Sequence, residues 1–292
     1  MRCLKPLVLY PGQMRERSVP CGKCVACLAN RRAEWCARLK IEQAYSDWSL
    51  FVTLTYAPAY LPYYPGGKPG FNKRHLQLFI KSLRKSIGGH SLRYYIISEY
   101  GENTLRPHYH ALLFLHGLSN DKDKRYSFQQ KFYNLVRSHW KYGHVQFGDV
   151  QAASIAYVTK YMLKDGHFPG GIKDDFVLMS LKPAIGSQLL DEHGFVDSFV
   201  NDFFSPTQLN YQGERSRMPR YLRDKIVERL PDEVEIRLQE RFKEFQRRYS
   251  LTMVDKCQRW QEKGLVPAFE LERTREYKTR QKNYHLKSHN KI

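Results

Sequence analysis

The order of its predicted elements indicates that this chain adopts an α+β fold, in which helices cover a mainly antiparallel sheet. Between residues 49 and 164 the pattern reads strand, helix, strand, strand, helix, strand, helix. Two of these strands are separated only by a short polar loop, which favours antiparallel pairing between them. The intervening helical segments each have one apolar face that can cover a sheet.

The strands are predicted where β-branched and aromatic residues run together. The segment SLFVTLTY has this composition, and the apolar run after His110 indicates a second strand that is buried on both faces. The predicted strands are 49–56, 92–99, 108–116 and a short one at 143–150.

The helices are predicted from apolar residues spaced three and four apart and from polar residues that can cap a first turn. Asn72 can cap a helix that ends at Gly88 and Gly89, and Ser127 can cap another that runs to Trp140. The predicted helices are 23–46, 72–87, 127–140, 151–164 and 221–249.

Prolines and glycines predict irregular structure elsewhere, because these residues interrupt regular hydrogen bonding. The last twenty residues, from Arg273, are basic and poor in apolar side chains, as is typical of a mobile tail. The segments predicted to be irregular or loop-rich are 1–22, 57–70 and 165–220.

The charge of the chain points to a polyanionic partner. Its 292 residues include 48 Lys and Arg against 29 Asp and Glu, a formal net charge of +19. Such an excess usually accompanies nucleic-acid binding. No apolar run is long enough to span a bilayer and no secretory signal is evident at the start, so we expect nucleic acid and not a membrane as the partner.

The cysteines are clustered near the start of the chain. The spacing Cys21-x-x-Cys24-x-x-Cys27, in a chain without a secretory signal, favours reduced thiols or metal ligands over disulfides. With Cys3 as a fourth thiolate, the set suits structural Zn²⁺, and Cys36 is an alternative fourth ligand. An iron–sulfur cluster also fits the spacing, and free thiols are a third interpretation.

A His-x-His pair begins the strand predicted at 108–116. His108 and His110 would share one face of that strand, and an antiparallel hairpin would bring Glu99 beside them. Two imidazoles and a carboxylate with open positions suit Mg²⁺ or Mn²⁺ in phosphoryl transfer. Glu102 is a competing third ligand, and a purely structural role for the two histidines is equally compatible with the pattern.

Two tyrosines lie four residues apart on the helix predicted at 151–164. Tyr157 and Tyr161 would stand one above the other, and each is followed three residues later by a lysine, Lys160 or Lys164. An ammonium group can lower the pKa of a phenol and neutralise a phosphate oxygen. The pair can therefore supply two nucleophiles, although an aromatic stripe that packs on the sheet is the simpler interpretation.

Together these motifs resemble an HUH-superfamily rolling-circle replication initiator, especially those of gokushovirus-type microviruses, which are small single-stranded DNA phages. The chain departs from the usual Ser-Arg-Lys-Pro-Gly-Ile-Gly run at Leu181 and Ala184. The segments that carry the resemblance are Cys21–Cys24 with Cys27, Phe51–Tyr56, Arg106–His110, Tyr157 and Tyr161 with Lys164, Ser180–Gly186, and Pro219–Tyr221.

The resemblance implies a ferredoxin- or RRM-like nuclease that acts in the cytoplasm of a bacterial host. It would nick one strand at the phage origin, link a tyrosine to the 5′-phosphate, leave a 3′-hydroxyl for a host polymerase, and later rejoin the displaced strand. Tyr161 is predicted to make the first cut, with Tyr157 as its alternate. No Walker-type loop is present, so a host helicase is expected to unwind the DNA.

Four segments follow from this interpretation: a Cys-rich segment at 1–30, an HUH nuclease core at 31–166, a loop-rich and helical extension at 167–250, and a basic tail at 251–292. The side chains predicted to contact DNA are Arg31, Arg32, Arg106 and Arg220. One alternative is a non-enzymatic, zinc-stabilised protein that binds single-stranded nucleic acid. A transposase or a plasmid relaxase-like enzyme would use the same chemistry.

Overall fold

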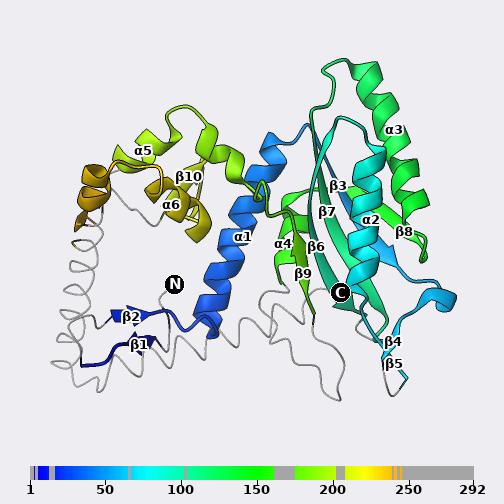
Figure 1. Cartoon of the computed structure of the whole chain (residues 1–292), viewed down its shortest axis with the longest axis horizontal. Helices are drawn as coiled ribbons and strands as arrows, with labels where there is room; N and C mark the ends of the chain where they lie inside the picture. Colours follow the sequence, from blue (N-terminus) through cyan, green and yellow to red (C-terminus); the bar gives the residue numbers. More distant parts are fainter. Residues whose placement is uncertain are drawn as a thin grey trace. The chain divides into compact units, whose positions relative to one another are not determined.

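A computed structural model gives the fold of the chain and divides it into two compact units (Figure 1). One unit is Arg38–Asp191, and the other combines Met1–Ala37 with Glu192–Ile292. The structure describes residues 3, 6–12, 17–64, 67–101, 104–160, 175–201, 208–238, 240–241 and 244.

A five-stranded sheet forms the centre of the unit Arg38–Asp191. Its strand order is β8-β3-β7-β6-β9, and every neighbouring pair is antiparallel. The predicted α+β class with a mainly antiparallel sheet is therefore confirmed. The strands are β3 (Trp48–Thr55), β6 (Ser91–Tyr100), β7 (Pro107–His116), β8 (Val145–Asp149) and β9 (Val177–Met179).

One face of this sheet packs against helices α2 (Lys73–Ser86) and α3 (Lys122–His139), and the contact forms the main hydrophobic core (Figure 1). Burial of each Leu or Phe side chain in such a core contributes about 1.5–3 kcal/mol. The fully buried residues include Leu50, Val52 and Leu54 of β3, Tyr109, Ala111, Leu113 and Leu115 of β7, Leu76, Phe79 and Leu83 of α2, and Phe132 and Val136 of α3.

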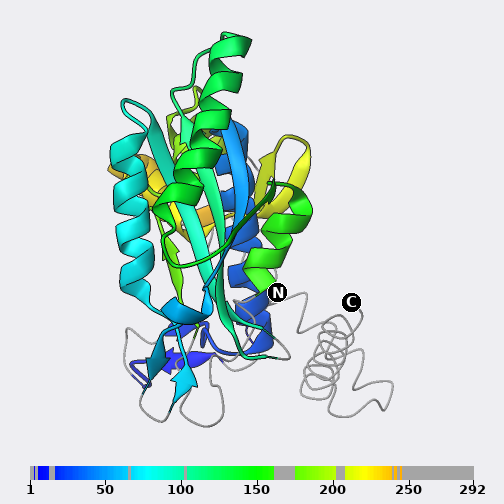
Figure 2. The ribbon, with the colours of Figure 1, turned by 90° about the vertical axis from the view of Figure 1, so that its right-hand side faces the viewer.

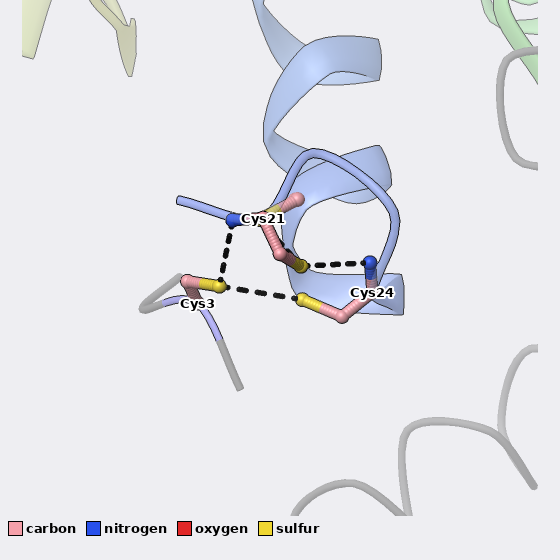
Figure 3. Close-up of side chains that lie close together, drawn as sticks. Cys3, Cys21 and Cys24 are labelled. Atoms are coloured by element: carbon pink, nitrogen blue, oxygen red, sulfur yellow. Dashed lines mark hydrogen bonds between the residues drawn. The ribbon is translucent and has the colours of Figure 1, made fainter. Parts of the chain in front are cut away.

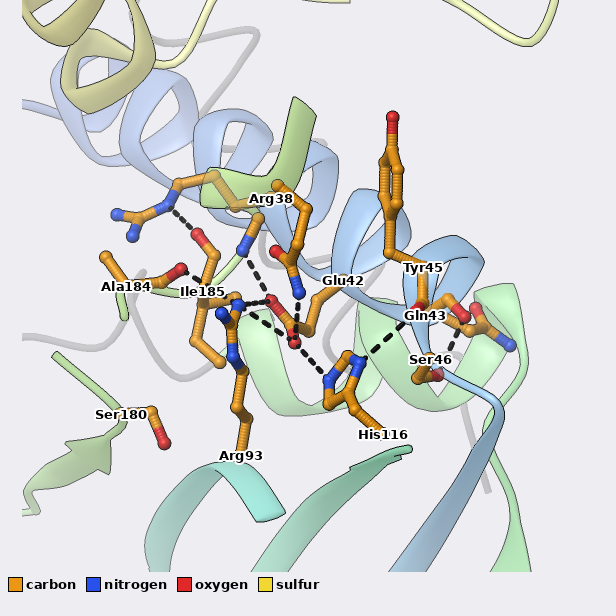
Figure 4. A network of polar contacts seen from close by, with 12 residues as sticks. Arg38, Glu42, Gln43, Tyr45, Ser46, Arg93, His116, Ser180, Ala184 and Ile185 are labelled. Atoms are coloured by element: carbon orange, nitrogen blue, oxygen red, sulfur yellow. Dashed lines mark hydrogen bonds and ion pairs between the residues drawn. The ribbon is translucent and has the colours of Figure 1, made fainter. Parts of the chain in front are cut away.

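The opposite face carries α4 (Ala152–Lys160) and the last turns of α1 (Val25–Tyr45). Here the buried carboxylate of Glu42 accepts hydrogen bonds from Arg93 at 2.9 Å, from His116 at 2.9 Å and from the backbone N–H of Gly186 at 2.7 Å (Figure 4). Burial alone would raise the pKa of Glu42, but these partners outweigh it and lower the pKa. The contacts anchor the segment before η3 (Ser187–Asp191) to the sheet.

The second unit contains two small hairpins and short helices around the first half of α1. Arg217 donates to Glu34 of α1 at 2.8 Å, which ties the second hairpin to that helix. Residues 232–238 are also helical. The other elements of this unit are β1 (Leu7–Leu9) paired with β2 (Arg17–Val19), α5 (Phe195–Asn201), β10 (Gln208–Tyr211) paired with β11 (Glu214–Arg217), and α6 (Arg220–Val227).

Two predicted helices have different bounds in the structure. The helix expected from Ser127 begins earlier, at Lys122, because Asp121 accepts from the backbone N–H groups of two residues in its first turn. The helix expected over 221–249 ends at Val227, and Pro231, which has no N–H to donate, separates it from the next helical stretch. The predicted helix 151–164 is helical over Ala152–Lys160, and its remainder lies outside the described residues.

Three segments predicted to be irregular contain short strands. Residues 1–22 include the β1–β2 hairpin, and 57–70 include the pair β4 (Tyr63–Tyr64) and β5 (Lys68–Pro69). Strand β9 lies within the loop-rich segment and pairs with β6 at the edge of the main sheet. These strands have two or three residues each, too few to establish an alternating pattern in the sequence.

Among the described residues, no helix combines the length and the apolar character needed to cross a membrane.

Candidate functional site

Antiparallel pairing brings three of the predicted site residues together at one end of the central sheet. Glu99 of β6 lies directly opposite His108 of β7, and His110 is two residues further along on the same face. Glu99 Oε2 lies 3.1 Å from His110 Nε2 and 3.6 Å from His108 Nε2. One potential ligand atom from each residue lies within 4.8 Å of the other two, so these atoms can surround one ion.

The carboxylate at this end of the sheet stays ionised although it is almost fully buried. Burial alone would raise the pKa of Glu99, but its contacts with His108, His110 and Tyr157 outweigh that effect and lower the pKa to about 2. Burial likewise favours neutral His108, yet the contact with Glu99 and the hydrogen bond to the carbonyl of Arg106 raise its pKa. The site thus holds a permanent negative charge between two imidazoles.

Neighbouring groups orient the two histidine rings. The carbonyl of Arg106 lies 3.2 Å from His108 Nδ1 and can accept its proton, which leaves Nε2 to face Glu99. The hydroxyl of Thr53, which lies opposite His110 on β3, is 3.0 Å from His110 Nδ1. Phe51 stacks on the His110 ring at a centroid distance of 5.5 Å. Both rings are therefore held with Nε2 toward the carboxylate.

Helix α4 places a phenol beside these three side chains. The hydroxyl of Tyr157 donates to Glu99 Oε2 at 2.8 Å and lies 3.4 Å from His110 Nε2. Lys160 Nζ lies over the Tyr157 ring, 4.1 Å from its centroid. A half-buried hydroxyl next to a candidate metal site is placed to attack a phosphate bound there.

Three of the predicted residues lie outside the described part of the chain. These are Tyr161 and Lys164 of the second Tyr-x-x-Lys motif, and Glu102, the alternative carboxylate ligand. The described residues join Glu99, and not a second carboxylate, to the two histidines.

The predicted DNA-contacting arginines have different surroundings. The Arg106 guanidinium donates to the backbone carbonyl of Tyr56 at 2.6 Å, so it links the residue after β3 to the start of β7. In the other unit, Arg31 is exposed and Arg32 is partly exposed on α1, and Arg220 faces Asp224 at 3.4 Å at the start of α6.

The four predicted cysteines come together where the first hairpin meets α1 (Figure 3). The sulfurs of Cys3 and Cys24 lie 3.9 Å apart, and those of Cys21 and Cys27 lie 4.0 Å apart. Thiolates that share one zinc ion at about 2.3 Å in a tetrahedron are separated by about 3.8 Å. Cys36, the alternative fourth ligand, is not a member of this cluster.

Backbone groups already stabilise negative charge on these sulfurs. The N–H of Cys24 donates to the sulfur of Cys21 at 3.3 Å, and that of Cys21 donates to the sulfur of Cys3 at 3.2 Å. Burial would raise the pKa of Cys21, but backbone hydrogen bonds outweigh it and lower the pKa. Burial raises the pKa of Cys27 to about 12, so this thiol ionises only when a cation is bound beside it.

Sequence reasoning overlooked the residues that orient the histidines. Thr53 and Phe51 were recognised only as parts of a strand, and Arg106 only as a DNA contact. The available signal was register: Thr53 and His110 each lie inside a predicted strand, and pairing of the two strands places the hydroxyl beside the ring.

A comparison with protein families agrees with this arrangement. Residues 49–166 match a family of replication-associated proteins of the ORF2 type. This segment contains Glu99, both histidines and Tyr157. The predicted resemblance to phage replication proteins is therefore confirmed.

Individual relatives extend the similarity beyond that segment. The chain is 36% identical over 154 residues to Replication-associated protein ORF2 of Spiroplasma virus 4, an alignment that covers 50% of this chain and 48% of the relative. It is 26% identical over 253 residues to Replication-associated protein VP4 of Bdellovibrio phage phiMH2K, with coverage of 77% and 76%. For Replication-associated protein ORF4 of Chlamydia phage 1, the identity is 25% over 218 residues, with coverage of 70% and 53%.

The aligned part thus spans about half the length of the Spiroplasma virus relative. No solved structure matches the chain.

Proposed function

We propose that this protein initiates rolling-circle replication by nicking one strand at a phage origin through a tyrosine, and that it later rejoins the displaced strand. The observation that carries the proposal is the hydroxyl of Tyr157, 2.8 Å from Glu99 and beside the histidine pair. A phenol, a cation site and a large positive charge are the parts that such a transesterification needs.

The reaction exchanges one phosphodiester for another. The tyrosine oxygen attacks the phosphorus, the bond from phosphorus to the 3′-oxygen breaks, and the leaving 3′-oxygen takes up a proton to become a free hydroxyl. The 5′-phosphate is then linked to tyrosine. Because the number of ester bonds is unchanged, attack of a 3′-hydroxyl on the phosphotyrosine reverses the step and closes a strand.

The residues at the end of the sheet fit Mg²⁺ or Mn²⁺. Glu99, His108 and His110 offer one oxygen and two nitrogens, a mixed donor set that suits Mn²⁺ at least as well as Mg²⁺. When bound, such an ion polarises the phosphate and neutralises charge that develops during attack. Glu99 also accepts the hydrogen bond from Tyr157, which directs the phenolic proton away from the side on which a phosphate would bind.

Two nucleophiles are needed for nicking and rejoining, and we assign them to Tyr157 and Tyr161. The first cut is assigned to Tyr161 from its place in the Tyr-x-x-Lys motif. Lys160, over the Tyr157 ring, and Lys164 are proposed to neutralise phosphate oxygens.

Partners and location follow from the same proposal. The substrate is single-stranded or locally melted origin DNA, and the free 3′-hydroxyl requires a host polymerase. A host helicase would separate the strands, and the reaction would take place in the cytoplasm of the bacterial host. The arginines Arg31, Arg32, Arg106 and Arg220 are proposed to contact the DNA backbone.

Formation of a covalent adduct tests the proposal. The purified chain is incubated with a single-stranded origin oligonucleotide and Mn²⁺, and we expect an SDS-stable, EDTA-sensitive protein–DNA species. If no adduct appears with any segment of the phage origin, the enzyme assignment fails. A non-enzymatic, zinc-stabilised DNA-binding protein, which the cysteine cluster also supports, would then be the better interpretation.

We further propose that the four cysteines hold a structural Zn²⁺. Sulfur separations of 3.9 and 4.0 Å, together with two N–H groups directed at sulfurs, support one ion shared by all four thiolates. Such an ion would join the start of the chain to the first turn of α1.

Replacing Cys24 by serine should release this zinc and lower the melting temperature of the unit that contains it. Elemental analysis should find about one zinc per chain in the unaltered protein and far less in the variant. Cys36→Ser is the matched control, because Cys36 lies on the same helix but outside the cluster. Equal zinc loss in both variants, or no zinc in the unaltered protein, would contradict the assignment.

Affinity for Mn²⁺ should rise with pH between about pH 6 and pH 8. The ion must displace a proton from His108, whose pKa is raised, so protons compete with it at low pH. Each pH unit below that pKa costs up to about tenfold in affinity. Glu99, with a pKa of about 2, stays ionised throughout and adds no pH dependence. Titration calorimetry at three pH values measures the effect, and an unchanged affinity would exclude His108 as a ligand.

A further inference from the structure

Two exposed tyrosines follow β3 at the end of the central sheet. Tyr60, in the short helix η1 (Pro58–Tyr60), is 54% exposed, and Tyr63 of β4 is 61% exposed. Large aromatic side chains gain stability by burial, so two exposed rings within four residues need a reason outside the free protein. Both belong to the unit Arg38–Asp191, which also contains the candidate metal site.

The first of these rings rests on a rigid stack. Tyr60 lies edge-on to Tyr142 with a centroid distance of 6.2 Å, and Tyr142 stacks on His75 at 3.7 Å with only 12° between the ring planes. His75 in turn hydrogen-bonds to the buried hydroxyl of Tyr56 at 3.1 Å. The exposed ring is therefore supported by the core and has little freedom to collapse onto it.

The backbone around the stack is also tightly held. The N–H of Ala57 donates to the carbonyl of Tyr142 at 2.8 Å, which joins the two segments that carry the stacked rings. A Cβ atom at Gly143 would lie 2.2 Å from the carbonyl oxygen of Thr55, so only glycine permits this close approach. In the β4–β5 hairpin, the hydroxyl of Tyr64 donates to the carbonyl of Phe71 and fixes the turn that displays Tyr63.

The surroundings of the two rings are basic. The segments 56–75 and 139–148 contain no Asp or Glu. Within them, four basic side chains are exposed, and these are Lys68, Lys73, Arg74 and Lys141. Exposed aromatic rings among cations without nearby anions are complementary to a single nucleic-acid strand, in which bases offer planar faces and phosphates offer negative charge.

The rings lie at the same end of the sheet as the metal site. Thr55, the last residue of β3, lies opposite His108, and the Arg106 guanidinium binds the carbonyl of Tyr56 at 2.6 Å. Figures 1 and 2 both show the β4–β5 hairpin beyond the end of the sheet at which β3 and β6 finish and β7 begins. A strand whose phosphate lies at His108 and His110 would reach these rings within a few nucleotides.

We propose that Tyr60 and Tyr63 form a stacking platform for unpaired bases of the DNA strand that flanks the cut phosphate. The platform rests on the proposed nickase function and identifies part of its substrate-binding surface. The rings hold bases by stacking, while the four basic side chains contact the phosphates between them. This arrangement would favour melted over paired DNA, because the faces of paired bases are covered by their neighbours.

The double variant Tyr60→Ala/Tyr63→Ala tests the platform in the full-length chain. Loss of stacking should weaken binding of a single-stranded origin oligonucleotide by about tenfold or more, measured by fluorescence anisotropy in EDTA so that no cutting occurs. The slope of affinity against salt should stay unchanged, because no phosphate contact is removed. Tyr60→Phe/Tyr63→Phe should bind normally, since the rings remain.

Tyr126→Ala is the matched control, because this tyrosine of α3 is 64% exposed and lies away from that end of the sheet. It should bind like the unaltered chain. Binding of the double alanine variant within twofold of the control, or equal losses in the alanine and phenylalanine variants, would overturn the platform. A loss of similar size with fully paired duplex would also do so.

The binding and adduct assays distinguish failure of the platform from failure of the nickase proposal. If the unaltered chain forms no adduct but the alanine variant still loses single-strand affinity, the platform stands without the nickase. If adduct forms and the alanine variant binds normally, only the platform fails. If both hold, the variant should form adduct at an unchanged maximal rate but need a higher DNA concentration.

Discussion

Glu99→Gln should reduce adduct formation by more than about a hundredfold, and His108→Ala and His110→Ala should do the same. Outer-shell partners of a metal already cost roughly 10–100-fold when removed, so loss of a direct ligand should cost more. In the free protein the Glu99 carboxylate faces both imidazoles and the Tyr157 hydroxyl, and a neutral amide cannot replace its charge. Adduct yield over a range of Mn²⁺ concentrations, together with Mn²⁺ binding by calorimetry, measures the effect.

Two controls make this result specific. His144→Ala removes an exposed imidazole near the same end of the sheet, where only its backbone pairs with Thr55, and it should leave adduct formation unchanged. Glu102→Gln should also have little effect, because Glu99 is the carboxylate that faces the two histidines. Normal EDTA-sensitive cutting by Glu99→Gln, with loss in Glu102→Gln, would transfer the third ligand to Glu102. Melting curves verify that each variant folds.

The central sheet and its site could be predicted because long segments with clear patterns form them. The apolar run after His110 and the segment SLFVTLTY each determine a strand, and pairing of β6 with β7 then places Glu99 opposite His108. Period-two alternation fixes which side chains share a face, so the ligand set followed from the sequence alone. The cysteine cluster could be predicted for a similar reason, since its spacing is local.

Contacts between distant segments could not be predicted in this way. Glu42 reads as one charged residue on a helix, yet it accepts hydrogen bonds from two strands and from Gly186 (Figure 4). The stack of Tyr142 on His75 joins segments almost seventy residues apart. Nothing local in the sequence specifies either contact, because their partners are chosen by how the elements pack.

The stacking platform shows the same limit from the functional side. The segment 57–70 was predicted to be a loop from its prolines and glycines, which describe the backbone but not what the loop displays. Its importance depends on which end of the sheet it extends, and that follows from the pairing of β3 with β7. A tyrosine-rich loop becomes a candidate DNA contact only once it lies beside the metal site.

Removing both tyrosine hydroxyls should abolish the adduct altogether. The variant Tyr157→Phe/Tyr161→Phe keeps both rings and removes only the nucleophilic oxygens, so its fold and its DNA affinity should be retained. Because no other phenol among the described residues hydrogen-bonds to Glu99 or the histidine pair, we expect no cutting above the uncatalysed background. Gel analysis of a labelled origin oligonucleotide in SDS measures the product, and Tyr126→Phe is the matched control.

The single variants separate the roles of the two hydroxyls. If Tyr161 makes the first cut, Tyr161→Phe should lose the initial adduct, while Tyr157→Phe should still form it and fail to release a closed circle. The opposite pattern would assign the first cut to Tyr157, whose hydroxyl already lies 2.8 Å from Glu99. Full activity in both single variants would mean that the hydroxyls are interchangeable, and rejoining would then be the step that requires the pair. Circle closure therefore carries more information than nicking, because only closure needs a second nucleophile while the first still holds the DNA.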